Sequence, residues 1–350
     1  MAANGPGPIV PSSMTVKPAN APVVMGSIPA DGSKGARGGA YSARVPTPPT
    51  PPTPTASDLA ERSRGLAAGV GAYVIWGFFP LLFPLLKPAE PLEILAHRII
   101  WSLVAVTVTM LLLRQSWGWL RQALTRERLP WVLAAAVLIG VNWLTYIWAV
   151  NTNHVVEASL GYFINPLVNI VLGVVLFGER MTRGGRLGTL LAAAGVGIIA
   201  WENWAGLWVS LVLAFSFGLY GAVKKRATAP ALGGLFLESA VLLPAALAYW
   251  AWLASTGGNH FSDSPAQAGL LVLGGVLTAI PLWLFAVAAR RLPYGVVGIL
   301  QYLGPTIQFI LGITVFGQHV TPSYWAGLAL VWAGSVVYLR SVFARARAHQ

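Results

Sequence analysis

The chain has 350 residues, of which 56% are hydrophobic and only 10% are charged, and its mean hydropathy is +0.66. Soluble domains are about a quarter charged, so this chain cannot cover a soluble globule with ionic groups, and its long apolar blocks exclude a disordered or collagen-like chain. The absence of cysteine excludes disulfides, thiolate metal sites and a cysteine nucleophile. The composition predicts a polytopic membrane protein.

Residues 1–64 differ in composition from everything that follows. They are rich in Gly, Ala, Ser and Pro, and the Pro- and Thr-rich run from Val45 to Pro54 favours polyproline II and cannot continue a helix. The apolar region of a cleavable signal peptide is missing from this stretch. We therefore expect a disordered cytoplasmic tail over residues 1–64, and a ligand for an SH3-like domain is the alternative.

From Gly65 onward, apolar blocks recur that can cross a bilayer, which takes about 20 helical residues. Ten transmembrane helices are expected, at residues 65–86, 93–113, 130–150, 155–177, 185–201, 205–223, 232–253, 267–289, 295–316 and 322–340. Several connections are very short, so neighbouring helices should run antiparallel. The block at 185–201 is marginal in length, and the count of ten depends on it.

The basic residues occur mainly in alternate loops. One side has most of the 23 Lys and Arg residues, among them Arg62, Arg114, Arg180, Lys224, Arg290 and Arg340. The loops of the other side contain Lys87 together with Glu90, Glu202 and Asp263. The positive-inside rule then predicts that both termini are cytoplasmic. It also explains the net charge of +12 without nucleic acid as a partner.

The second half of the chain repeats part of the first. Residues 166–195 match residues 305–334 without a gap: Pro166, Leu172, Gly173, Phe177, Gly178, Thr182, Gly188, Ala194 and Gly195 recur as Pro305, Leu311, Gly312, Phe316, Gly317, Thr321, Gly327, Ala333 and Gly334. The match predicts two repeats of five helices, at 65–201 and 205–342, followed by a cytoplasmic tail at 343–350.

An odd number of spans turns the second repeat upside down in the membrane. Inverted repeats are the architecture of many secondary transporters, whose substrate site lies near the midplane between the halves. The expected fold class is therefore an all-α integral membrane protein with ten transmembrane helices in two inverted five-helix repeats.

Three stretches resemble the signatures of the RarD family, in the EamA branch of the drug/metabolite transporter superfamily. They are Ala96–Ser102, Asn142–Asn151 and Glu157–Leu167. The resemblance extends over roughly residues 64 to 342. It implies ten helices in two inverted repeats and export of small metabolites. Names of bacterial relatives refer to chloramphenicol sensitivity, but the resemblance does not fix a substrate.

Polar side chains inside the expected spans are candidates for the substrate and coupling pathway, because a charge at a helix centre costs about 2.5–3.5 kcal/mol on insertion scales. The candidates are His97, Arg98, Asn142, Tyr146, Glu157, Tyr162, Asn165, Asn169, Glu238, Gln301 and Tyr302. Glu157, Asn165 and Asn169 belong to one polar stripe in which residues follow each other at intervals of four. Trp76 and Tyr162 are candidates for lining a cavity that accepts aromatic cargo.

Several interpretations of these residues stay open. Arg98 and Glu157 either pair or bracket a polar substrate, with Glu157 or His97 titrating; alternatively, Arg98 snorkels to the headgroups and Glu157 caps its helix. Glu238 belongs to the same pathway or pairs with Lys224 or Lys225. Gln301, with Gln308 two turns further on, binds a ligand or hydrogen-bonds between helices.

Pro166 and Pro305 occupy matching positions in the two repeats and are candidate hinges; a static bend is the alternative. The sequence contains no motif of a zinc protease, a serine hydrolase or a phosphate-binding loop, and no cofactor, metal or catalytic residue is expected.

The sequence therefore predicts a secondary active transporter that exports a small organic metabolite or amphiphilic drug across the bacterial plasma membrane by alternating access. A passive channel or facilitator and, more remotely, an intramembrane enzyme are the alternatives. The expected partners are a small-molecule substrate, the lipid bilayer and a coupling proton, and the functional unit is a monomer or a homodimer.

Overall fold

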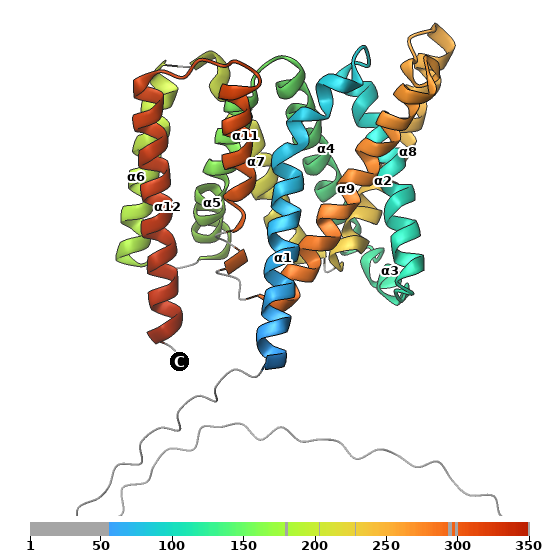
Figure 1. Ribbon diagram of the computed structural model, residues 1–350. Coiled ribbons are helices and arrows are strands. Elements are labelled where there is room, and N and C mark those ends of the chain that lie inside the picture. Colours follow the sequence, from blue (N-terminus) through green and yellow to red (C-terminus); the bar gives the residue numbers. More distant parts are fainter. Residues whose placement is uncertain are drawn as a thin grey trace, which may run out of the picture. The chain divides into compact units, whose positions relative to one another are not determined.

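The computed structural model describes residues 56–178, 181–202, 204–227, 229–292, 296–297 and 300–348, and these residues form helices and their connections. The long helices are α1 (Ala56–Phe78), α2 (Pro91–Leu112), α4 (Leu129–Asn151), α5 (Val155–Phe177), α6 (Arg183–Glu202), α7 (Trp204–Ala227), α8 (Ala231–Thr256), α9 (Pro265–Arg291), α11 (Leu303–Thr314) and α12 (Pro322–Ala348) (Figure 1). The short ones are α3 (Gly118–Ala123), η1 (Phe79–Leu81), η2 (Phe83–Leu86) and η3 (His260–Ser262). The expected all-α class is confirmed.

In the described part of the chain, eight helices are long and apolar enough to cross a membrane, judged by length and composition: α1, α2 and α4 to α9. They follow the first eight expected spans in order. The ninth differs from its expected range of 295–316, because α11 is shorter and begins after a turn at Gln301 and Tyr302. Pro305 is the third residue of α11, a position where a helix needs no backbone donor. Pro305 therefore lies in the first turn of a helix and does not interrupt one.

The first expected span also has different ends. Helix α1 begins at Ala56, so residues 56–64 are helical and the expected tail boundary at 64 is wrong. Residues 55–64, which follow Pro54, include the good helix formers Ala, Leu, Glu and Arg. Residues 1–55 lie outside the described part. At the other end of the chain, α12 continues to Ala348, beyond the expected end of the tenth span at 340.

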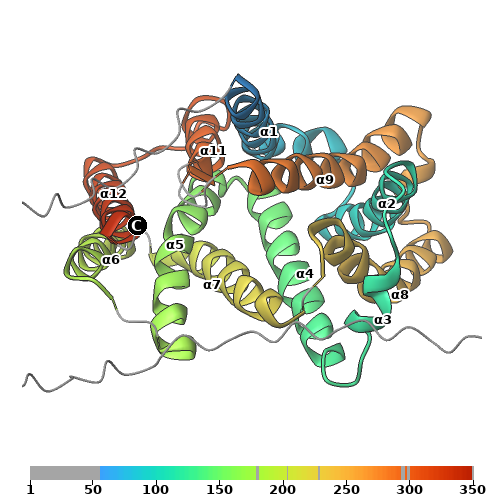
Figure 2. The same cartoon turned by 90° about the horizontal axis from the view of Figure 1, so that it is seen from below.

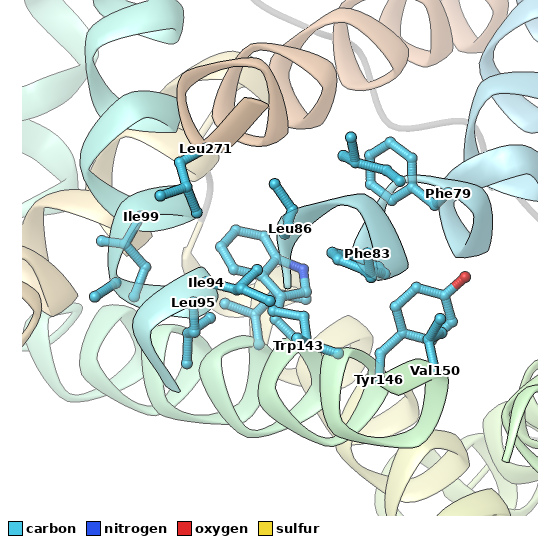
Figure 3. Close-up of a cluster of buried hydrophobic side chains, with 14 of the residues drawn as sticks. Phe79, Phe83, Leu86, Ile94, Leu95, Ile99, Trp143, Tyr146, Val150 and Leu271 are labelled. Carbon is cyan, nitrogen blue, oxygen red and sulfur yellow. The ribbon is translucent and has the colours of Figure 1, made fainter. Parts of the chain in front are cut away.

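The chain leaves α1 through two short 3-10 helices because its sequence repeats Phe-Pro-Leu-Leu over residues 79–86. Each proline stands near the start of one of them, where its missing N–H is tolerated. Their buried side chains enter the largest apolar cluster, which joins these turns to α2, α4 and α9 (Figure 3). The labelled members are Phe79, Phe83, Leu86, Ile94, Leu95, Ile99, Trp143, Tyr146, Val150 and Leu271.

The helix packing has the pattern of two exchangeable halves. Helix α1 packs on α9 and α11, and α7, its counterpart in the second half, packs on α4 and α5. Likewise α2 packs on α9 while α8 packs on α4. Two further contacts join counterparts directly, α2 with α8 and α6 with α12. Exchanging the first five long helices with the last five thus maps each of these contacts onto another of them or, for the two contacts between counterparts, onto itself.

Helices α6 and α12 lie side by side at one edge of the bundle, where they also pack against α5 (Figures 1 and 2). Glycines let their backbones meet. A Cβ atom on Gly195 would collide with the carbonyl oxygen of Gly327, and one on Gly188 with that of Gly334. The order of these contacts makes the two helices antiparallel. This small-residue packing is typical of membrane helices, where close van der Waals contact replaces the hydrophobic effect.

A polar contact joins the start of α2 to the connection between α8 and α9. The Glu93 carboxylate accepts hydrogen bonds from the backbone N–H of His260 at 2.8 Å and lies 2.7 Å from the Nδ1 atom of the same residue. Glu93 is buried, so these partners replace water around its charge. Because Glu93 begins α2 and His260 follows α8, the contact also shows that α2 and α8 run antiparallel.

Candidate functional site

A cavity of about 380 Å³ lies among the helices of both halves, and no described side chain of α6 or α12 lines it. Ligand pockets usually measure about 300–1,000 Å³, so it has the size for a small organic molecule. Its aromatic wall consists of Tyr73, Trp76, Phe79, Trp143, Tyr146, Tyr162, Phe217, Tyr220 and Phe285. The other lining residues are Arg98, Ile139, Asn142, Asn165, Lys224, Leu235, Glu238, Thr278, Leu282, Gln301, Gly304, Pro305 and Gln308.

The aromatic wall follows a simple pattern. Tyr73 and Trp76 are three residues apart on α1, as are Phe217 and Tyr220 on α7, its counterpart. Residues three apart share one face of a helix, so each pair faces the cavity together. Trp143 and Tyr146 form a third such pair on α4. This pattern is visible in the sequence, although only Trp76, Tyr146 and Tyr162 were predicted to line a pathway.

Arg98 on α2 is the buried cation of the cavity, with 5% of its surface exposed. Its Nε atom donates to the Thr278 hydroxyl at 2.8 Å. Its guanidinium carbon lies 4.6 Å from the ring centre of Trp143 and 5.3 Å from that of Phe79. Cation–π contacts of this kind offset part of the desolvation of the charge. No carboxylate of the described residues forms an ion pair with Arg98.

Asn142 links α4 to α5 and α7. Its amide nitrogen donates to the backbone oxygen of Leu213 at 3.1 Å and to the Ser216 hydroxyl at 3.0 Å, and its amide oxygen accepts from the Tyr162 hydroxyl at 3.2 Å. These partners occupy both ends of the side chain. Asn142 therefore fixes the position of Tyr162 in the cavity wall.

Four polar atoms of the cavity wall are buried and have no hydrogen-bond partner among the described residues. They are Nη1 of Arg98, the hydroxyl of Tyr146, Oδ1 of Asn165 and Oε1 of Gln308. Buried polar atoms are nearly always paired in folded proteins, and each exception calls for a reason. Their presence in one cavity indicates a site that a polar ligand or water completes.

A carboxylate and an amine meet at another part of the cavity. Lys224 on α7 lies 2.8 Å from Glu238 on α8, and the Tyr220 hydroxyl donates to both carboxylate oxygens, at 3.1 and 3.0 Å. The predicted alternative that Glu238 pairs with Lys224 is what the structure shows. The sequence analysis gave Lys224 as a loop charge and a possible partner of Glu238, but not as a residue of a cavity wall.

Four predicted pathway residues do not line the cavity. His97 is stacked on Phe261, with ring centres 4.8 Å apart, and Asn169 is exposed. Glu157 lies near the Gln318 amide, and Tyr302 stacks on Phe163. Arg98, Asn142, Tyr146, Tyr162, Asn165, Glu238 and Gln301 do line it.

The expected pair of Arg98 with Glu157 does not form. Arg98 donates a hydrogen bond to Thr278 of α9. Glu157 lies beside Gln318, which belongs to the connection between α11 and α12. Arg98 does not snorkel to a membrane surface either, since it is buried. Among the described residues, no three His, Asp or Glu side chains gather as a metal site would require.

Comparisons with known proteins show the family and the fold of the chain. The sequence model of the EamA-like transporter family matches twice, at residues 63–201 and 204–340. The chain is 47% identical to Protein RarD of Streptomyces exfoliatus, over 79% of this chain and 88% of that protein. It is 41% identical to a Pseudomonas aeruginosa protein named as an uncharacterized transporter, over 80% and 94%. A solved crystal structure aligns with a TM-score of 0.53 at 18% identity, over 79% and 97%, and shares the fold. The chain is therefore a membrane transporter protein of the RarD type and belongs to the EamA-like transporter family.

Proposed function

We propose that this chain is a secondary active transporter that exports a small organic metabolite or amphiphilic drug by alternating access, with the cavity as its substrate site. The observation that carries the proposal is the set of unpartnered polar atoms in an aromatic cavity built from both halves of the chain. A substrate held there is surrounded by helices of both repeats. Relative movement of the repeats then changes the side from which it is reached.

The two halves are residues 65–201 and 205–342, in opposite orientations. The double match of the family model and the exchangeable packing of the helices support this division. The start of α1 and the end of α12 lie at the same end of the bundle (Figure 1). That end carries Arg291, which contacts Glu61 at 2.7 Å. We place it in the cytoplasm and the chain in the bacterial inner membrane, because basic residues gather in the loops of this side. The described wall of the cavity comes from one chain, which supports a monomer as the transport unit, with a homodimer as the alternative.

Counterflow in proteoliposomes tests the alternating-access mechanism. We expect that the purified full chain exchanges internal unlabelled substrate for external labelled substrate. In a carrier with one binding site that opens to the two sides in turn, the site that brings labelled substrate in can return with unlabelled substrate bound. The probes are chloramphenicol, phenylalanine and 3-(4-hydroxyphenyl)propionate, each labelled. Saturable counterflow of at least one probe is expected. Flux that neither saturates nor shows counterflow would identify a channel instead.

A coupling proton is the second part of the proposal. Glu238 is the carboxylate of the described cavity wall and has Lys224, Tyr220 and, across the cavity, Arg98 as its charged or titratable neighbours. We expect Glu238→Gln to abolish substrate movement driven by a pH gradient and to leave counterflow in place, because the amide cannot exchange a proton. Glu157→Gln is the comparison, since Glu157 does not line the cavity. Retained pH-driven movement in Glu238→Gln would remove this residue from coupling.

Pro166 remains the better hinge candidate of the two prolines. It lies inside α5 and leaves the backbone oxygen of Tyr162, a cavity residue, without its helical donor. We expect Pro166→Ala to slow counterflow several-fold without changing substrate affinity, because alanine stiffens the helix. Pro244→Ala in α8 is the matched control, a proline inside a helix but away from the cavity. Equal effects of both variants would contradict a hinge at Pro166, and Pro305→Ala tests the second candidate in the same assay.

A further inference from the structure

We propose that the cavity binds a carboxylate-bearing organic monoanion with an aromatic or apolar body and a neutral hydrogen-bond donor, and that Arg98 binds its carboxylate. This inference names the substrate class of the site described above and rests on the proposed function for the cavity being the transport site.

The first observation is the way in which Arg98 is held. Its Nε atom is occupied by the Thr278 hydroxyl, and neither terminal nitrogen donates to a described residue. The Trp143 and Phe79 rings contact the guanidinium group. These contacts fix the group and leave its two terminal nitrogens without a hydrogen-bond partner among the described residues. The two terminal nitrogens together can bind a carboxylate through two parallel hydrogen bonds.

The second observation is the charge balance of the cavity. Its described wall contains three ionic side chains, Arg98, Lys224 and Glu238, and the last two neutralise each other at 2.8 Å. Arg98 lies two turns into α2, and Glu238 lies two turns into α8, the antiparallel counterpart. Arg98, the unpaired charge, therefore lies towards the opposite end of these two helices from the ion pair of Lys224 and Glu238. A bound monoanion neutralises the cavity, whereas a zwitterion leaves one net positive charge in a medium of low dielectric constant.

The third observation concerns the rest of the ligand. Nine aromatic residues of the described part of the chain line the cavity, and aromatic walls favour an aromatic or apolar body. The side-chain oxygens of Asn165 and Gln308 are buried acceptors without a donor among the described residues. A hydroxyl or ring N–H on the ligand supplies that donor without adding charge.

Binding of three related probes tests the assignment. The probes are 3-(4-hydroxyphenyl)propionate, its uncharged amide and tyrosine, which differ in charge and share the ring and hydroxyl. Binding to the purified full chain is followed by tryptophan fluorescence, since Trp76 and Trp143 line the cavity, and by calorimetry. We expect the monoanion to bind at least about tenfold more tightly than the amide or tyrosine, the effect of a charged hydrogen bond.

Variants then assign the effect to one residue. Arg98→Gln should weaken binding of the monoanion about 10- to 100-fold and leave binding of the amide unchanged. Arg98→Lys should retain part of the affinity, because it keeps the charge and loses the planar fork. Lys87→Gln removes an equal charge at an exposed position outside the cavity and is the matched control. If Arg98→Gln does not fold, the role of Arg98 is tested with Arg98→Lys. Preference for the carboxylate is then tested by comparing the acid with the amide on the unaltered protein.

The outcomes separate this inference from the proposed function. Equal binding of acid and amide, preference for tyrosine, equal losses for both probes in Arg98→Gln, or no binding of the monoanion would each overturn the inference. If the protein carries out counterflow of tyrosine or the amide but does not bind the acid, the proposed transport function is supported and the monoanion is not the substrate class. Arg98-dependent binding of the acid without counterflow would support the inference and overturn the transport mechanism.

Discussion

Replacing Gly195 with valine is expected to lower the free energy of unfolding by about 3 kcal/mol, at the upper end of the usual cost of overpacking. A Cβ atom at this position meets the Gly327 carbonyl oxygen and lies 3.0 Å from side-chain atoms of both Leu330 and Val331. A backbone oxygen cannot turn aside as a flexible side chain can. The added atoms must therefore push α6 away from α12. Apparent melting temperature in detergent, at one fixed heating rate, measures the loss.

Gly197→Val is the matched control on the same helix. No heavy atom lies within 4 Å of a Cβ atom built on Gly197, and the residue is exposed. Its substitution should change stability by no more than about 0.5 kcal/mol, as is usual for surface positions. Similar melting temperatures for Gly195→Val and Gly197→Val would contradict the close backbone contact of α6 and α12. Because neither helix lines the cavity, properly folded Gly195→Val protein should still bind the probes.

Lys224→Met is expected to cost about 3–5 kcal/mol of stability, the usual penalty for removing one partner of a buried ion pair. Glu238 has 4% of its side chain exposed, so without Lys224 its charge is left inside the bundle with Tyr220 as its remaining hydrogen-bond partner. Denaturant or thermal unfolding of Lys224→Met against the unaltered chain measures this cost.

The double variant Lys224→Met with Glu238→Met should recover most of the stability, because two apolar side chains of suitable volume often replace a buried pair without loss. Glu238→Gln alone should cost less than Lys224→Met, since the Lys224 side chain is 24% exposed and can keep some water. A double-mutant cycle gives the coupling between the two residues. A coupling near zero, with each single variant as stable as the unaltered chain, would contradict a structural role for the pair.

The polar stripe of the fourth expected span illustrates how far sequence reasoning reached into the site. Residues at intervals of four drift by about 40° per step around a helix. Asn165 therefore faces the cavity while Asn169, one step further, is exposed, and Glu157, two steps earlier, lies at Gln318. The sequence identifies the stripe but not the point along it at which the neighbouring helices enclose a cavity.

Arg98 is a second example. A buried arginine in a membrane helix was predictable as a functional candidate from the cost of its charge. Its partner was not, because Thr278 and the Trp143 ring belong to α9 and α4, far from Arg98 in sequence. An acidic residue such as Glu157 is the natural guess when only charges are considered.

The sequence by itself determined the class of protein, the order of the helices, the repeat and the family resemblance. These follow from local properties, since the hydropathy of a 20-residue block and the position of loop charges do not depend on how helices pack. Only the tertiary structure decided which polar residues share the cavity, that Glu238 is paired and Arg98 is not, and that α6 and α12 stand outside the site. Those outcomes depend on which faces of distant helices meet, because the same polar side chain can pair with a neighbouring helix or line a cavity.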